Sequence, residues 1–168
     1  MDRTLERFSK RDKAIFKRVV KSYATHDKLR ANVLANELAE IRKVEKMLMQ
    51  ATLALESISL RLKTVSELGD VVTVLTPAVS VLNNIKSRMT NIVPEADKEL
   101  EDVGKLLTEI VSSTSQTNGL PVNFEAANEE AAKILEEAAS VAEQRIKKKL
   151  PELPAEVSIK EKVKLKTK

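Results

Sequence analysis

Side chains that commonly do chemistry are few in this sequence and stand far apart. Its 168 residues contain no cysteine and a single histidine, His26, so a metal site built from His and Cys side chains is excluded. A lone histidine beside a predicted helix junction is typically structural or solvated, and no nucleophile, base and orienting group can be assembled around it. The glycines at 69, 104 and 119 are too widely spaced for a phosphate-binding loop. The sequence therefore predicts a protein that is not an enzyme and uses no metal or cofactor.

Charge is unevenly distributed along the chain. Residues 1–30 hold ten Lys or Arg against four acids, residues 95–143 hold twelve acids against three Lys, and residues 145–168 hold nine bases against three acids. Charged residues usually coat solvated helix faces. Segregation on this scale also predicts that the acidic helices over 95–111 and 124–149 fold back on the basic hairpin and keep the subunit closed, or that the basic part meets an anionic surface once released.

The composition favours an all-α fold. Aromatic residues make up 2% of the chain and there are three glycines, whereas sheets favour aromatic and β-branched residues and need turn glycines. The longest apolar-rich run, VVTVLTPAVSVL at 71–82, contains a proline and is too short to span a bilayer, which takes about 20 residues.

Two helices begin the chain. Apolar residues at helical spacing predict a first helix over 2–24, interrupted in its stripe by Arg11 and Asp12, and Thr25 or Asp27 is expected to cap the next helix. That second helix should run without a break over 29–68. It carries two apolar columns with a spacing of seven, which form a coiled-coil seam: Leu34, Ile41, Leu48, Leu55 and Leu62, and Val44, Ala51, Ile58 and Val65. The first helix is the expected antiparallel partner but is shorter, so the remaining seam needs a later helix or another copy of the chain.

Shorter helices are expected to follow. After a break at Gly69 and Asp70, Thr76 and Pro77 either open a helix that ends near residue 92, or Pro77 kinks a helix begun at 71. Pro94 should open the next helix, ending near 111. The polar stretch at 112–123 is predicted to be a flexible linker, and Asn123 to cap an acidic helix over 124–149 whose narrow face of small residues suits a detachable element.

The stretch LPELP, Leu150 to Pro154, is the least helical part of the sequence. Two prolines favour an extended segment without internal hydrogen bonds, from which Leu150 and Leu153 can fill pockets of a partner. The alternative is that Pro151 stops the helix and Pro154 stiffens a tail.

The order of these parts resembles the ESCRT-III family, and specifically the archaeal CdvB-type cell-division proteins. The segment DKLRANVLANELAEIRKVEKMLMQATLALESISLRLKTV, residues 27–65, is similar to the second-helix segment of that family, including its ANE, EIRK and LALE elements. GDVVTVLTPAVSVLNNIKSRM and VPEADKELEDV continue the resemblance, and LPELP resembles the type-2 MIT-interacting motif by which an AAA ATPase grips such subunits. The first helix is shorter than usual in the family, and the chain ends 14 residues after LPELP without the winged-helix domain of some members. We therefore expect a short paralogue that joins the division ring without binding the ring's membrane recruiter, and whose membrane attachment is weaker or whose start is trimmed.

The resemblance implies a domain plan and a function. It implies an ESCRT-III-like helical core over 1–111 (hairpin 2–68, further helices 71–92 and 95–111), a linker, a regulatory helix, a motif and a basic tail over 155–168. The implied protein is cytoplasmic and peripheral on the inner face of the cell membrane. It polymerises with itself and with related subunits, constricts and cuts the membrane in division or vesicle release, and is taken apart by an AAA ATPase with a MIT domain.

Three groups of residues are implied as sites. Those expected to face the anionic membrane are Arg3, Arg7, Lys10, Arg11, Lys13, Lys17, Arg18 and Lys21. Those expected to bind the MIT domain are Leu150, Pro151, Leu153 and Pro154. The seam residues given above are expected to pack the hairpin and the polymer. Two other classes remain open: a lipid-independent coiled-coil scaffold, and a helical protein that binds nucleic acid nonspecifically, for which stacking aromatics and a specific motif are lacking.

Overall fold

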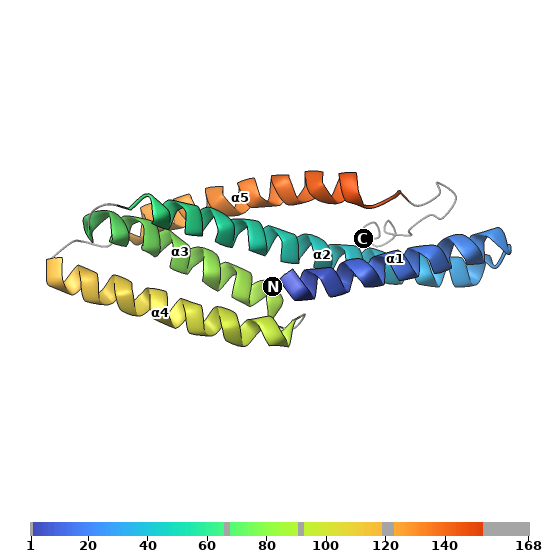
Figure 1. The fold of residues 1–168 in the computed structure, drawn as a ribbon, viewed down its shortest axis with the longest axis horizontal. Coiled ribbons are helices and arrows are strands. Elements are labelled where there is room, and N and C mark those ends of the chain that lie inside the picture. The colour runs from blue at the N-terminus through green and yellow to red at the C-terminus, as the bar shows by residue number, and fades with distance from the viewer. Residues whose placement is uncertain (1, 66–67, 91–92, 119–122, 153–168) are drawn as a thin grey trace, which may run out of the picture.

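Five α-helices account for most of the residues that the structure describes. The computed structural model describes residues 2–65, 68–90, 93–118 and 123–152, and no strand occurs among them. The helices, shown in Figure 1, are α1 (Asp2–Ala24), α2 (Lys28–Lys63), α3 (Leu68–Met89), α4 (Pro94–Asn118) and α5 (Phe124–Lys149). The predicted all-α, hairpin-first fold is confirmed.

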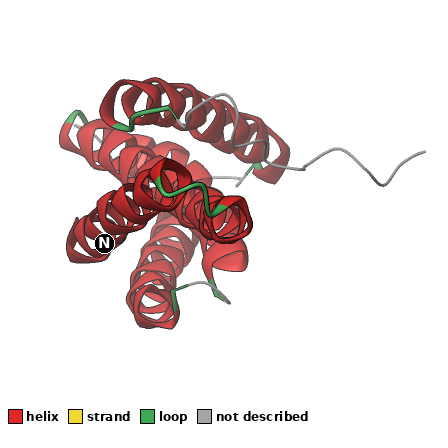
Figure 2. Cartoon of the chain, turned by 90° about the vertical axis from the view of Figure 1, so that its right-hand side faces the viewer, coloured by secondary structure: helices red, strands yellow, loops and turns green. Residues whose placement is uncertain are grey.

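The first two helices form a long antiparallel hairpin. Their connecting turn projects beyond the other three helices at one end of the molecule (Figure 1). Figure 2, which looks along the molecule from that end, shows α1 and α2 nearest the viewer and the other helices behind them. Near the turn the core is therefore built from the hairpin alone, and it consists of Ile15, Val19, Leu34, Ala35, Leu38 and Ile41.

The turn closes α1 through a left-handed residue. His26 has a φ of 57°, and its N–H donates to the Tyr23 carbonyl at 3.0 Å. The Asp27 N–H donates to the Ser22 carbonyl, also at 3.0 Å, and this pair of bonds is the Schellman arrangement of helix ends. The Asp27 carboxylate then accepts from the Arg30 N–H at 3.1 Å and caps α2, as predicted for one of two candidates. The single histidine is thus exposed and shapes a turn.

The second half of α2 is covered by later helices of the same chain. There α3 and α5 pack against it, and α4 packs on α3. The shared core includes Leu48, Ala51 and Ile58 of α2, Val81 and Ile85 of α3, and Ile134 of α5, all at most 5% exposed. Of the two ways to cover the long seam, packing against later helices of this chain is the one observed.

Proline 77 lies inside α3 and does not begin it. The helix starts at Leu68, so the predicted break at Gly69 and Asp70 and the predicted cap at Thr76 are wrong, and the alternative that placed Pro77 inside a helix already begun is the one observed. Thr76 instead donates its hydroxyl to the Val72 carbonyl at 2.7 Å, within the turn where Pro77 supplies no amide hydrogen. The helix therefore continues through Pro77 without a break, and Pro77 itself is buried.

Helix α4 continues through most of the predicted linker. It reaches Asn118, whereas a flexible segment was expected from 112 onward. The stretch SSTSQTN is polar but contains neither glycine nor proline, and Val111 at its start is buried. The Ser113 hydroxyl donates to the Ile110 carbonyl at 3.1 Å, a local bond that helices accommodate. The strong helix breakers come only at Gly119 and Pro121, which lie outside the described residues.

Candidate assembly and motif-binding surfaces

The eight basic side chains predicted on the first helix all lie exposed on α1. They are Arg3, Arg7, Lys10, Arg11, Lys13, Lys17, Arg18 and Lys21. Lys10 pairs with Glu6 one turn away at 2.8 Å, and Arg11 pairs with Glu37 across the hairpin at 3.0 Å. Arg7 lies over the ring of Phe8, 5.9 Å from its centroid. Since the apolar face of α1 is fixed against α2, these bases form an outward-facing row.

Five of these bases have side chains without a partner among the described residues. The side chains of Arg3, Lys13, Lys17, Arg18 and Lys21 make no ion pair or hydrogen bond with any residue that the structure describes. A charge without an internal partner keeps its full attraction for a surface of opposite sign. Some bases of the row thus bond within the hairpin, and the others are available to bind an external anion.

The seam residues are largely internal in this conformation. Those in the buried clusters are Leu34, Ile41, Leu48, Ala51 and Ile58, while Val44, Leu55 and Leu62 are partly buried against them and Val65 is half-buried. The expectation of packing within the hairpin holds for Leu34 and Ile41, which meet α1. Toward the C-terminal end of α2 the seam meets α3 and α5. A contact between copies through that part requires one of these helices to move away.

The acidic helix α5 folds back on the hairpin, as expected, but does so through α2, whereas the acidic helix α4 packs on α3. Helix α1 pairs only with α2, whereas α5 lies along α2 and α3. The reason is local charge matching on α2, where Lys46 binds Glu143 at 3.0 Å and Arg61 binds Glu130. Hydrogen bonds from Lys147 and Lys46 lower the pKa of Glu143 to about 2. Helix α5 is therefore held by ion pairs as well as by its narrow face.

That narrow face of α5 consists mostly of alanines. The buried residues are Ala127, Ala131, Ile134, Ala138 and Ala142, while Val141 is 39% exposed. Small side chains let two helix backbones approach, and the Gln50 amide of α2 donates to the Leu135 carbonyl of α5 at 3.0 Å. The Asn123 side chain caps the helix by accepting from the Ala126 N–H at 3.1 Å, as predicted.

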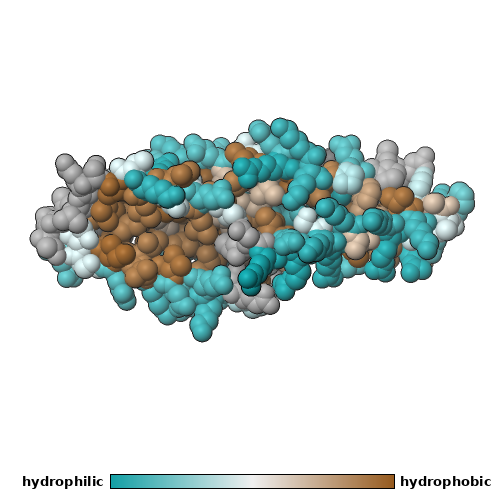
Figure 3. Space-filling view, viewed as in Figure 1, coloured by the Kyte–Doolittle hydropathy of each residue, from teal (hydrophilic) through white to brown (hydrophobic). Residues whose placement is uncertain are grey.

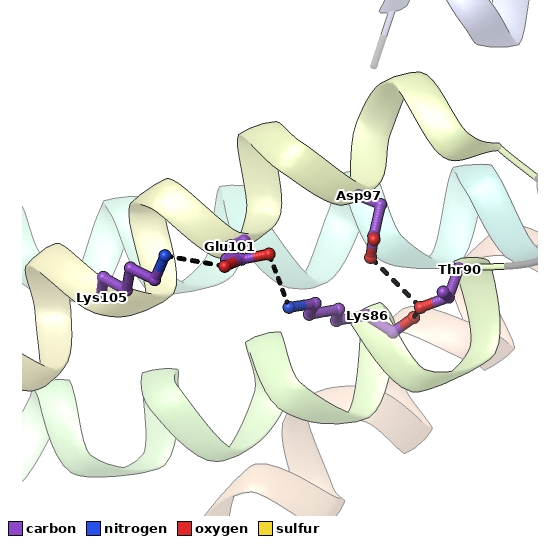
Figure 4. A network of polar contacts seen from close by, with 5 residues as sticks. All are labelled: Lys86, Thr90, Asp97, Glu101 and Lys105. Carbon is purple, nitrogen blue, oxygen red and sulfur yellow. Dashed lines mark hydrogen bonds and ion pairs between the residues drawn. The ribbon is translucent and has the colours of Figure 1, made fainter.

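Two acids of helix α4, Asp97 and Glu101, bond to side chains at the end of α3. Figure 4 shows Glu101 between Lys105, at 2.7 Å, and Lys86 of α3, at 3.2 Å, with Asp97 accepting from the Thr90 hydroxyl at 3.1 Å. Hydrogen bonds from Lys105 and Lys86 lower the pKa of Glu101. The groove of about 640 Å³ between α3 and α4 is lined by Lys86, Glu101 and Lys105 of this network, together with Glu109 and several uncharged side chains.

Sequence reasoning missed a buried polar joint between α1, α2 and the end of α5. Arg42 of α2 donates through Nε to Asp12 Oδ2 at 2.8 Å and through Nη2 to the Pro151 carbonyl at 3.0 Å. Asp12 and Glu45 are both fully buried, and burial, with the neighbouring Asp12, raises the pKa of Glu45. The only signal in the sequence was that Asp12 interrupts the apolar stripe of the first helix.

The predicted motif is described only in part. Leu150, at the end of α5, is 7% exposed, whereas Pro151 is exposed; Leu153 and Pro154 lie outside the described residues. The Leu150 N–H donates to the Ile146 carbonyl at 2.9 Å, and its extended backbone ends the helix. Pro151 thus follows the helix stop, as the alternative interpretation expected, and a role in binding a partner is not tested by this geometry.

The sites described so far are surfaces and helix joints. Within the described ranges, no group of three or more His, Cys, Asp or Glu side chains is placed to hold a metal ion. No described helix is both long and apolar enough to cross a membrane. The fold defines a class of all-helical protein built on a long, basic-faced hairpin with a covering C-terminal helix.

Comparison with known proteins shows the family of the chain. Cell division protein B1 of Sulfolobus acidocaldarius is 45% identical over 155 residues, which are 92% of this chain and 72% of that protein. Cell division protein B of the same organism is 34% identical over 154 residues, 92% of this chain and 59% of the relative's length. No family model matches, and no solved structure matches. The chain belongs to the CdvB family of ESCRT-III proteins.

Proposed function

We propose that this chain is a non-enzymatic structural component of archaeal cell division that polymerises on the inner face of the cell membrane and remodels it. The observation that carries the division role is the 45% identity, over 92% of the chain, to a protein named for cell division. Two further features support membrane polymerisation: the basic outer face of α1, and a seam that another helix of the chain covers.

The membrane contact is assigned to α1. Lys13, Lys17, Arg18 and Lys21 are exposed and unpaired among the described residues, on a helix whose other side is fixed to α2. Each base near an anionic lipid surface contributes on the order of 1 kcal/mol, and salt weakens the attraction. A rigid row of such bases favours contact of α1 with the surface of the membrane over insertion of the helix into it.

Contacts between copies are assigned to apolar surface on α2, α3 and α4. Figure 3 shows an apolar area on the face formed by α3 and α4. A groove on α2, α3 and α4 is lined by Leu55, Leu82, Leu100 and Val103, and Val103 is 46% exposed. Departure of α5 would add the buried second half of the seam to this surface. Disassembly is assigned to an AAA ATPase that grips LPELP.

Liposome sedimentation tests the membrane role. The intact chain is expected to pellet with anionic vesicles and not with neutral ones, and negative-stain microscopy should then show filaments or deformed tubules. Replacing Lys13 and Lys17 by Gln should weaken pelleting by roughly 30-fold, since two bases supply about 2 kcal/mol. The matched control carries Arg88→Gln and Lys98→Gln, exposed bases on α3 and α4.

The outcomes separate the three classes of protein. Equal weakening by the control pair would assign the attraction to net charge alone, not to α1. An oligomer of fixed small size, indifferent to both vesicle types, would favour the coiled-coil scaffold. A steep salt-dependent shift of DNA or RNA without vesicle binding would favour nucleic acid as the partner.

A further inference from the structure

The hairpin buries two carboxylates, and three of their four oxygen atoms have no hydrogen-bond partner. Asp12 of α1 and Glu45 of α2 are both 0% exposed. Asp12 Oδ2 accepts from Arg42 Nε at 2.8 Å, but Asp12 Oδ1 and both oxygens of Glu45 accept from no residue that the structure describes. Buried polar groups in proteins nearly always have a partner, so three unpaired acceptors in one place require a physical explanation.

The charges of this buried group do not balance. Arg42 supplies one positive charge, and two of its nitrogen atoms are already engaged, Nε by Asp12 and Nη2 by the Pro151 carbonyl at 3.0 Å. Lys149 of α5 also acts on Glu45, but it is exposed, so solvent weakens its effect. Glu45 thus lacks a base of its own, and a buried carboxylate in that position is far more stable neutral than charged.

A single proton would remove both deficits. A protonated carboxyl group carries no charge and gains an O–H donor, and two carboxylates that share a site usually bind one proton between them. Burial, and then the neighbouring Asp12, raise the pKa of Glu45, while Ser9, Lys149 and Arg42 oppose the rise. The Ser9 hydroxyl of α1 is near enough to favour the charged form of Glu45 but lies outside hydrogen-bond geometry.

We propose that Asp12 and Glu45 form a buried site that binds one proton at neutral pH, carried by Glu45 and donated as a hydrogen bond to Asp12 Oδ1. Arg42 selects the carrier, because it neutralises Asp12 through the Nε bond and leaves Glu45 without a donor. Loss of the proton places an uncompensated charge between α1 and α2, so the hairpin is sensitive to alkaline pH. The inference goes beyond the proposed function, since neither carboxylate belongs to the surfaces or the motif assigned there.

Infrared spectroscopy of the intact folded chain tests where the proton lies. A protonated carboxyl group and a carboxylate absorb at separate frequencies, and carboxyl groups in water are ionised at pH 7. The intact chain should therefore show a protonated carboxyl band at pH 7 that disappears in Glu45→Gln. Glu40→Gln, which changes an exposed acid of the same helix, should keep the band. Absence of the band from the intact chain, or its persistence in Glu45→Gln, would overturn the proposal.

Proton release on unfolding gives an independent measurement. When the chain is unfolded by urea in unbuffered solution at pH 7, Glu45 reaches water and ionises, so Glu45→Gln should release about one proton fewer than the intact chain. Glu40→Gln should release as many as the intact chain. Equal release by Glu45→Gln and the intact chain would mean that the site holds no proton. A carboxyl band that is absent while stability rises with added sodium or potassium chloride would assign the balancing charge to a cation and overturn the proposal as well.

Discussion

The buried acids of the described chain, Asp12 and Glu45, lie together at the joint between α1, α2 and the end of α5. They differ in their hydrogen bonding. Asp12 is bonded to Arg42, whereas neither carboxylate oxygen of Glu45 has a hydrogen-bond partner in the described structure. Burial raises the pKa of Glu45, and Asp12 on α1 adds to the rise; Ser9 on α1, Lys149 on α5 and Arg42 on α2 oppose it. A buried, unsatisfied carboxylate costs stability when it is charged.

Glu45→Gln should therefore stabilise the protein at pH 7 and have little effect at pH 4. The pKa of Glu45 is raised in the folded state above its ordinary value of 4.5, so the folded state loses stability as pH rises from there through the raised pKa. Glutamine has no charge to bury and should increase the free energy of unfolding at pH 7 by about 1 kcal/mol. Urea unfolding at both pH values measures this.

The matched control is Glu40→Gln, an exposed acid of the same helix, which should change little at either pH. An equal gain at pH 4 and pH 7 from Glu45→Gln would trace the effect to packing and contradict the assignment to charge.

Helix α4 contains a position at which a single substitution should make the protein more stable. Gly104 lies in the middle of the helix, and a Cβ added there would meet nothing within 4 Å. Glycine in a helix interior costs roughly 0.5–1 kcal/mol relative to alanine, largely through the entropy of the unfolded chain. Gly104→Ala should raise the free energy of unfolding by about that amount, measured in urea. A loss of stability would show that α4 needs this glycine.

The reverse change serves as its control. Ala132 is exposed on α5, and Ala132→Gly should cost about as much as Gly104→Ala gains. If only one of the two substitutions follows helix propensity, the other site has a tertiary contact that dominates it.

Features fixed by neighbouring residues could be predicted from the sequence, and features fixed by distant ones could not. The bounds of α1, the caps Asp27 and Asn123 and the exposed bases follow from local spacing. The sequence left open whether Pro77 begins a helix or lies inside one, and that choice could not be made because burial of the proline depends on tertiary packing. The bond between Arg42 and Pro151 joins elements whose approach no local pattern encodes.

On the scale of the whole molecule, α2 is shared between two partners. Its first half completes a hairpin with α1, and its second half depends on α3 and α5 for cover. Because α5 docks through small side chains and partly exposed ion pairs, its attachment is the weaker of the two. Opening can therefore expose apolar surface without unfolding the hairpin.

Deleting residues 119–168 should increase self-assembly, because α5 is lost while α1 to α4 remain. Light scattering at equal concentration should show larger particles than the intact chain gives. The control deletion removes residues 153–168 and leaves all of α5, and it should scatter like the intact chain. If the longer deletion also stays as monomeric as the intact protein, α5 does not restrain assembly.

Because α5 lies far from α2 in the sequence, the hairpin is synthesised well before the helix that covers the second half of α2. The hairpin joins neighbouring segments and can form as soon as both are made, whereas the bond from Lys46 to Glu143 joins residues 97 positions apart. At about 5–20 residues per second, the ribosome takes roughly 4–17 seconds to add the remaining residues up to the end of α5. During that interval the second half of the seam in every nascent chain lacks the cover of α5. Nascent chains on neighbouring ribosomes of one message can therefore associate before α5, which restrains assembly, has been made.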